Sequence, residues 1–203
     1  MTEIKVPMAK PVFEKEEIDG ILNVVKSGWL GQGNVTKQFE ENLSNYFSAN
    51  VMAINSGSSA TMCAMLAHGV KPGDRIVVPD FTFISTCSVP KILGAEVIPV
   101  DIDPTTLNLD LTALEDIVSK NDIKMVVFVD VGGLSNDLDK LEKLSKKYNF
   151  ILLEDAAEGL GSEYKNKKLG SHNHTSFFSF HIAKQITTVE GGCINTKNEE
   201  FYQ

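Results

Sequence analysis

The 203-residue sequence predicts an α/β fold in which a mostly parallel β-sheet carries helices on both faces, in three layers. From residue 51 onward, apolar runs of strand length alternate with segments of helical periodicity. The runs are hydrophobic throughout and not at every second residue, which is typical of strands buried on both faces of a parallel sheet. Turn residues separate the runs from the helical segments, as such a fold requires.

Residues 1–50 are expected to form a helical arm, and residues 51–203 to form the α/β domain. Within the arm, apolar residues at three- and four-residue spacings predict helices over residues 14–26 and 35–47. The stretch between them, SGWLGQGN at residues 27–34, contains three glycines and the only tryptophan of the chain. This composition indicates a shaped loop.

Within the α/β domain, each apolar run predicts a strand and each periodic segment a helix. The expected strands cover residues 51–54, 75–79, 96–101, 124–130 and 150–155, and two further strand-like runs cover 175–180 and 191–196. The expected helices cover residues 58–68, 83–93, 111–119 and 138–148. Pro90 is expected to kink or shorten the second of these helices.

The composition limits the classes of partner and location. The formal net charge of -8 and the pI near 5.0 argue against nucleic acid or an anionic membrane as partner. No apolar run approaches the length of a membrane span, and the first residues lack the apolar core of a signal peptide, so we expect a cytoplasmic protein. Cys63, Cys87 and Cys193 are scattered among apolar residues and are expected to be buried free thiols.

A candidate phosphate site follows the first strand. The motif NSGSSAT at residues 55–61 passes through Gly57 into a helix whose first turn holds Ser58 and Ser59. Backbone N–H groups, hydroxyls and the helix dipole would hold a phosphate at this place. A plain serine N-cap with a tight turn explains the motif equally well. No Walker loop or GxGxxG pattern is present.

Two further strand ends carry candidate ligand-binding side chains. PDFTFIST at residues 79–86 offers Phe81 and Phe83, either of which could lie flat on a planar ring or pack in the core. LLEDAAEG at residues 152–159 places Glu154, Asp155 and Glu158 after an apolar strand. A carboxylate there could keep a bound heterocycle's ring nitrogen protonated, cap a helix or bind a metal. Because no histidine cluster accompanies it, metal is the weakest alternative, and no metal site is expected.

A single lysine, Lys184, lies in FSFHIAKQITTVEGG at residues 178–192, between an apolar run and a pair of glycines. A lysine just past a buried strand can lose part of its solvation and become an amine nucleophile, although an ordinary solvated lysine is commoner at such a position. Ser179 precedes it at the end of the run. A phosphate cup, an aromatic platform, an acidic group and a lysine therefore follow in order, and together they meet the requirements of pyridoxal phosphate.

The chain closely resembles the DegT/DnrJ/StrS sugar aminotransferases, which have the type I pyridoxal-phosphate aminotransferase fold. The resemblance extends over essentially all 203 residues, and its motifs include NSGSSAT, VPDFTFIST, GAEVIPVDIDPTTLNLD, EDAAEGLGSEYKNKKLGS and FSFHIAKQITTVEGG. It implies that Lys184 forms a Schiff base with the cofactor and later moves a proton between substrate and cofactor. It also implies that Asp155 pairs with the pyridine nitrogen and that Phe83 stacks on the ring, leaving Phe81 to packing. The residues implied for the cofactor phosphate are Ser58, Ser59 and Ser179.

The chain departs from the family at two positions and in length. Glu158 stands where the family commonly has a glutamine that donates to the cofactor's phenolic oxygen, so Glu158 is either protonated or faces water or substrate. Asp130 stands where many relatives have histidine, and its role is open. Family chains are considerably longer, so we expect a fragment or a truncated gene product that lacks the small C-terminal domain. The family forms dimers in which the partner completes each site, and a homodimer is expected here.

The resemblance implies transfer of an amino group from glutamate to a keto group of a nucleoside-diphosphate-linked deoxysugar. Related deoxysugar dehydratases carry histidine at the position of the Schiff-base lysine, so Lys184 favours transamination. Two alternatives stay open. The chain could be a noncatalytic binding or regulatory module of the same fold, or a doubly wound nucleotide-binding protein that uses NSGSS as its phosphate loop.

Overall fold

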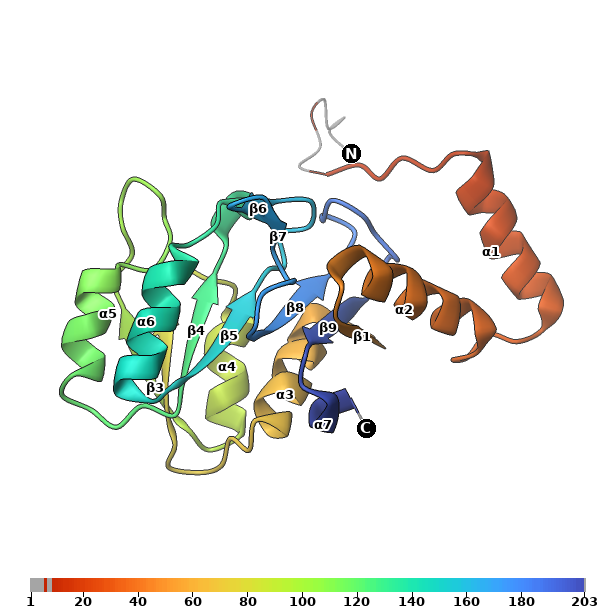
Figure 1. The fold of residues 1–203 in the computed structure, drawn as a ribbon. Coiled ribbons are helices and arrows are strands. Elements are labelled where there is room, and N and C mark those ends of the chain that lie inside the picture. Colours follow the sequence, from red (N-terminus) through yellow and green to blue (C-terminus); the bar gives the residue numbers. More distant parts are fainter. Residues whose placement is uncertain (1–5, 7–8, 203) are drawn as a thin grey trace, which may run out of the picture.

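The computed structural model, which describes residue 6 and residues 9–202, contains a seven-stranded sheet between two layers of helices (Figure 1). The strand order is β1-β9-β8-β5-β4-β2-β3. The β9 strand runs antiparallel to both of its neighbours, and every other pairing in the sheet is parallel. The predicted α/β class, with a mostly parallel sheet, is confirmed.

Each strand and helix that the sequence predicts begins and ends within one residue of its predicted range, and α7 (Glu199–Tyr202) was not predicted. The strands of the sheet are β1 (Asn50–Ile54), β2 (Arg75–Pro79), β3 (Glu96–Val100), β4 (Met125–Val129), β5 (Ile151–Asp155), β8 (Thr175–Ser179) and β9 (Gly192–Thr196). A small hairpin of β6 (Glu163–Tyr164) and β7 (Lys167–Lys168) was not predicted, because strands of two residues are too short to show a period.

The helices are α1 (Lys15–Ser27), α2 (Asn34–Phe47), α3 (Gly57–Ala67), α4 (Ile84–Ile92), α5 (Leu111–Val118), α6 (Leu138–Tyr148) and α7 (Glu199–Tyr202). Pro90 lies inside α4, two residues before the end of that helix. In the part of the chain that the structure describes, no helix is long and apolar enough to cross a membrane.

The core lies on both faces of the sheet, which explains why the strands are apolar throughout. In β4, Met125 and Val127 belong to a cluster with α3, whereas Val126 and Phe128 belong to a cluster with α5 and α6. Successive side chains of a strand point to opposite faces, so every position of a central strand in a three-layer fold is buried. Figure 1 shows the two helical layers on either side of the sheet.

The two N-terminal helices differ in how they pack. The α2 helix buries Leu43 and Phe47 against the sheet, whereas α1 has no buried residue and leaves the apolar side chains of Ile18 and Val25 exposed. Figure 1 shows α1 beyond the far end of α2. The division into an arm and an α/β domain stays a prediction, and the first residues of that arm, 1–5 and 7–8, lie outside the described residues.

The expectation that all three cysteines are buried is wrong for Cys63. Cys193 is buried and Cys87 is half-buried, but Cys63 is exposed. The buried stripe of α3 consists of Ala60, Thr61, Ala64 and Met65, and Cys63 lies outside this stripe. Helical spacing, and not local composition, decides which side chains of a helix face the core.

Candidate functional site

A cavity of about 380 Å³ lies at the carboxyl ends of the parallel strands, where the loops after β1, β2, β5 and β8 meet. This is the edge at which an open α/β sheet binds ligands, and the volume is in the range of small-molecule sites. The residues that the sequence predicts for a site and that line the cavity are Ser58, Phe83, Asp155, Ser179 and Lys184. The other lining residues are Ser56, Gly57, Ser85, Ala157, Phe177, His181, Ala183 and Glu190.

The turn from β1 into α3 contains both a serine N-cap and hydroxyls that face the cavity, which are the two interpretations of its sequence. Ser56 is the N-cap: its Oγ accepts the Ser59 N–H at 3.1 Å and donates to the Ser59 Oγ at 3.0 Å. Ser58 and Ser179 line the cavity, whereas Ser59 does not, and the polar groups of Ser59 are engaged by this cap. The first turn of α3 and the end of β8 therefore present hydroxyls and a positive helix end to the same space.

Two glycines allow these segments to approach each other. A Cβ on Gly57 would lie 3.0 Å from the Cβ of Ser179. A Cβ on Gly192, at the start of β9, would lie 2.7 Å from the carbonyl oxygen of Phe178 and 2.8 Å from the carbonyl carbon of Ser56. Backbone atoms cannot move aside as a flexible side chain can, so only glycine fits at residue 192.

Asp155 ends β5 with its side chain turned into the cavity wall. The residue is 4% exposed. Its Oδ1 accepts the Ala157 N–H at 3.1 Å, and its Oδ2 accepts the Thr86 hydroxyl at 3.3 Å. Burial raises the pKa of Asp155 to about 6, and the two hydrogen bonds act in the opposite direction.

The structure excludes a helix-capping role for Asp155 and offers no support for a metal-binding role. No helix begins after Asp155, since residues 156–162 form turns, so Asp155 is not a helix cap. Among the described residues, no group of three or more histidine, cysteine, aspartate or glutamate side chains could hold a metal ion. The carboxylate is thus a buried acceptor that faces the cavity.

Lys184 lies in the loop after β8, lines the cavity and forms an ion pair with Glu158, which does not line it. Its Nζ is 3.2 Å from the Oε1 of Glu158, and the lysine side chain is 22% exposed. The Oε2 of Glu158 accepts the Gly132 N–H at 2.9 Å. This backbone hydrogen bond, followed by the charge of Lys184, lowers the pKa of Glu158. Glu158 is therefore ionised, and its side chain is 46% exposed, which agrees with the alternative that it faces water; its pairing with Lys184 was not expected.

The two phenylalanines after β2 are not equivalent. Phe83, the residue before α4, lines the cavity and is 68% exposed. Phe81 does not line the cavity, and it is 51% exposed, so the packing role expected for it is wrong. An exposed aromatic ring at a cavity edge is free to contact a planar ligand.

Sequence reasoning missed three contributors to the site. Ser56 could have been found from its place before a helix, since serine is a preferred N-cap. Thr86 lies within the motif PDFTFIST, but its contact with Asp155 depends on how α4 packs. Gly132 binds Glu158 across 26 residues of sequence, and no local signal predicts this contact.

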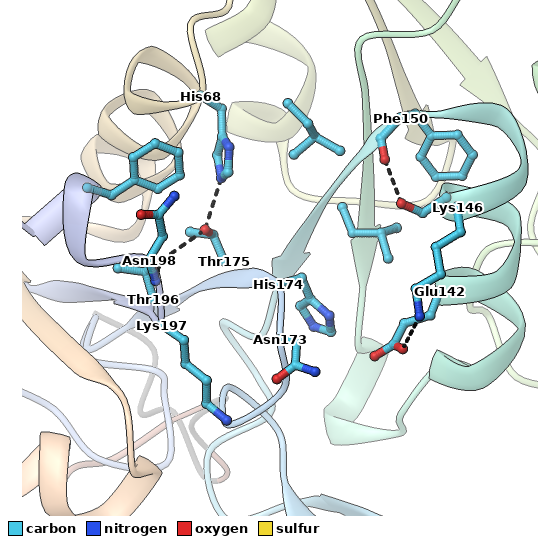
Figure 2. A pocket seen from close by; sticks show the side chains of 14 residues that line it. His68, Glu142, Lys146, Phe150, Asn173, His174, Thr175, Thr196, Lys197 and Asn198 are labelled. Atoms are coloured by element: carbon cyan, nitrogen blue, oxygen red, sulfur yellow. Dashed lines mark hydrogen bonds and ion pairs between the residues drawn. The ribbon is translucent and has the colours of Figure 1, made fainter.

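A second cavity, of about 510 Å³, lies at the opposite edge of the sheet, where β5 and β8 begin (Figure 2). The side chains of His68, His174 and Lys197 line it, and His68 Nε2 is 2.9 Å from the Thr175 Oγ1. None of the residues predicted for a site lies in this cavity. Five of the predicted site residues thus line the first cavity, and Ser59 and Glu158 line neither cavity.

Comparison with known proteins places the chain in one family. The model of the DegT/DnrJ/EryC1/StrS aminotransferase family matches residues 11–203. A UDP-4-amino-4-deoxy-L-arabinose–oxoglutarate aminotransferase of Shewanella sediminis is 31% identical over 196 residues, which are 96% of this chain and 50% of that protein. The spore coat polysaccharide biosynthesis protein SpsC of Bacillus subtilis is 36% identical, with the same coverage. The chain spans about half the length of the curated relatives it matches.

Solved structures agree with this placement. An aminotransferase from Psychrobacter cryohalolentis superposes with a TM-score of 0.89 at 30% identity, over 95% of this chain and 49% of that one. A GDP-4-keto-6-deoxy-D-mannose-3-dehydratase of E. coli with bound hydrated PLP superposes with a TM-score of 0.92 at 32% identity, over 98% of this chain and 53% of that one.

Proposed function

The chain belongs to the DegT/DnrJ/EryC1/StrS aminotransferase family, and we propose that it forms the cofactor-binding part of a pyridoxal-phosphate-dependent sugar aminotransferase. The observation that carries the proposal is the meeting of Lys184, Asp155, Phe83 and Ser179 in one cavity, although they come from the ends of β5 and β8 and from the loops after β2 and β8. An amine nucleophile, a buried carboxylate, an aromatic face and a hydroxyl are the groups that this cofactor requires.

The residues present fit pyridoxal phosphate. At one end of the cavity, the first turn of α3 with Ser58 and Ser179 offers hydroxyls and a helix N-terminus suited to a phosphate. Gly57 and Gly192 leave this end free of side-chain atoms at the point where three segments converge. Asp155, whose oxygens are held by Ala157 and Thr86, offers a fixed acceptor for a ring N–H.

When bound, pyridoxal phosphate supplies an electron sink that stabilises a carbanion next to an amino group. Asp155 is ionised above its pKa of about 6, and its negative charge would keep the ring nitrogen protonated. Lys184 would supply the amine nucleophile and move the proton at the reacting carbon. Lys184 lines the cavity, and the ion pair holds its Nζ 3.2 Å from the Glu158 Oε1.

The substrates are proposed from the relatives. The Shewanella sediminis relative is named for a UDP-linked amino sugar and for oxoglutarate, which is the keto acid of glutamate. We therefore assign glutamate as amino donor and a keto group of a nucleoside-diphosphate-linked deoxysugar as acceptor, in polysaccharide biosynthesis. Lys184, at the position where the related dehydratases carry histidine, supports transamination over dehydration. The homodimer and the cytoplasmic location stay predictions.

The experiment that tests this proposal mixes the purified chain with pyridoxal phosphate and records the absorbance spectrum before and after glutamate is added. Wild type and the surface variant Lys71→Ala are expected to give a protein-bound chromophore that glutamate shifts, whereas Lys184→Ala gives neither change. No bound chromophore in wild type would refute the cofactor assignment for this chain. If wild type forms the chromophore but transfers no amino group to keto sugars, the result would instead support the noncatalytic binding module.

A further inference from the structure

Two acidic side chains meet in the core on the face of the sheet opposite Asp155. Asp130 follows β4 and Glu154 lies in β5, and both are 0% exposed. In the β4–β5 ladder, Glu154 pairs with Phe128, so Asp130, two residues further along, lies on the same face. The carboxyl groups of Asp130 and Glu154 lie close enough for each to shift the pKa of the other.

Each carboxyl group is satisfied at one oxygen and unpaired at the other. The Oδ1 of Asp130 accepts the backbone N–H and the side-chain N–H of Asn136, both at 3.1 Å. The Oε2 of Glu154 accepts the Gly170 N–H and lies 3.1 Å from the His174 Nε2. The Asp130 Oδ2 and the Glu154 Oε1 are fully buried and have no partner among the described residues. Two ionised carboxylates in this place would leave two acceptors without a donor and two charges in contact.

We propose that Asp130 and Glu154 share one proton between the Asp130 Oδ2 and the Glu154 Oε1, and that this singly charged pair positions the strand end that carries Asp155. One O–H donated from Asp130 to Glu154 satisfies both unpaired oxygens and removes one of the two buried charges. Glu154 then accepts three hydrogen bonds, from Asp130, Gly170 and His174, which is a suitable setting for a buried carboxylate.

The surroundings favour this protonation state. Burial, followed by the negative charge of Glu154, raises the pKa of Asp130 well above its usual range, and burial raises the pKa of Glu154 to about 7. Burial lowers the pKa of His174 to about 4, so this ring is neutral and donates through Nε2. The charged and titratable groups that act on the pair or on His174 are Asp155, from the opposite face of the sheet, and His172, Glu142, Lys167 and Lys197.

The pair ties together the segments behind the cavity. Through Asn136 it holds the approach to α6, and through Gly170 and His174 it holds the loop before β8, which is the strand that leads to Lys184. His174, which borders the second cavity in Figure 2, is 6% exposed at its side chain. The Asp130 N–H also donates to the Asp155 carbonyl at 3.1 Å. The positioning of Asp155 rests on the proposed function, whereas the shared proton does not.

Amide substitutions test the shared proton in the cofactor-free chain. In Asp130→Asn, an amide N–H replaces the shared O–H and donates to Glu154. In Glu154→Gln, the new amide N–H donates to an ionised Asp130. Each single variant therefore keeps one donor and one acceptor in contact. The double variant brings two N–H groups together. Urea unfolding followed by circular dichroism at pH 7 is expected to leave each single variant within about threefold of the wild-type folding constant. The folding equilibrium constant of the double variant is expected to fall by about tenfold or more beyond the product of the two single-variant effects.

The pH dependence gives a second readout. Wild type is expected to lose stability above pH 7 as the shared proton leaves, while Asp130→Asn, whose amide proton does not titrate there, keeps its stability over the same range. An additive double variant, or equal pH slopes for wild type and Asp130→Asn, would overturn the shared proton. Because none of these measurements uses cofactor, they succeed or fail independently of the proposed function.

The positioning role is tested by the affinity for pyridoxal phosphate. At pH 7 without urea, the dissociation constant of each single variant for pyridoxal phosphate is expected to lie within about threefold of the wild-type value. The dissociation constant of the double variant is expected to be higher than the wild-type value by about tenfold or more. A double variant that binds as tightly as wild type would refute the positioning role. If wild type itself binds none, the proposed function fails while the unfolding result on the shared proton still stands.

Discussion

Replacing Asp155 by asparagine is expected to stabilise the cofactor-free chain at alkaline pH, although it removes the group that pairs with the ring nitrogen. A buried carboxylate without a counter-ion destabilises the folded state whenever it is ionised. Asparagine has the same shape, and it can still accept the Ala157 N–H and contact the Thr86 hydroxyl. In a protein that is active, the same variant is expected to keep the coloured adduct, because Lys184 is unchanged. It is expected to lose most turnover, because asparagine cannot keep the ring nitrogen protonated.

The magnitude follows from the pKa of Asp155. Its folded value of about 6 lies above its ordinary value of 3.8, so protonation stabilises the fold fully below pH 3.8, and this stability is lost as pH rises through about 6. This rise in the pKa of Asp155 corresponds to about 3 kcal/mol in total. Between pH 4.5 and pH 8, wild type should lose about 2 kcal/mol through this group, and Asp155→Asn should lose none through it.

Urea unfolding of the cofactor-free chain at pH 4.5 and pH 8 measures this difference. The quantity that matters is the change in unfolding free energy of Asp155→Asn minus that of wild type, because the exposed acids are present in both proteins and cancel in this difference. Asp122→Asn, at an exposed aspartate, is the control and should show no such difference. A variant that gains no stability over wild type from pH 4.5 to pH 8 would show that Asp155 is not buried as described.

Two further substitutions test the shape of the cavity. Phe83→Ala is expected to raise the dissociation constant for pyridoxal phosphate more than Phe81→Ala does, because only Phe83 lines the cavity; a spectroscopic titration that ranks them in the opposite order would assign the platform to Phe81. Gly192→Ala is expected to cost about 2 kcal/mol or more of unfolding free energy, since its Cβ would meet two backbone atoms. Gly20→Ala, with open space around it in α1, is the control and should gain up to about 1 kcal/mol, so equal effects in urea unfolding would contradict the close approach at residue 192.

The sequence predicted the positions of the elements well because period and composition are local properties. The β4 strand is apolar on both faces, and α6 has its leucines at helical spacing, so both could be placed within one residue. Four of the motifs could be gathered in one cavity because the carboxyl ends of parallel strands share an edge.

Contacts that depend on loops were not predictable. The ion pair of Lys184 with Glu158 joins residues that are 26 positions apart in the sequence, and it requires the loop after β8 to fold back over the turn after β5. Glu158 is ionised and half-exposed, so it faces water as one alternative had it, but its pairing with Lys184 was not expected. Cys63 shows the same limit within a helix, because apolar neighbours in sequence did not place its side chain in the core.

The acidic pair illustrates a third kind of limit. Asp130 and Glu154 were both noticed in the sequence as polar residues near strand ends, but their contact depends on the register of β4 against β5. A shift of one residue in that register would move Glu154 to the other face of the sheet. Only the folded structure shows that the two carboxyl groups meet, and that each leaves one oxygen without a donor.

The assignment of Lys184 is tested most directly by fixing the cofactor to the protein. The chain is mixed with pyridoxal phosphate, reduced with borohydride and digested, and the labelled peptide is identified by mass spectrometry. The label is predicted on Lys184, with Lys71→Ala labelled to the same extent and Lys184→Ala unlabelled. A label distributed over surface lysines, or one that persists in Lys184→Ala, would contradict the role of Lys184 as the cofactor-binding amine.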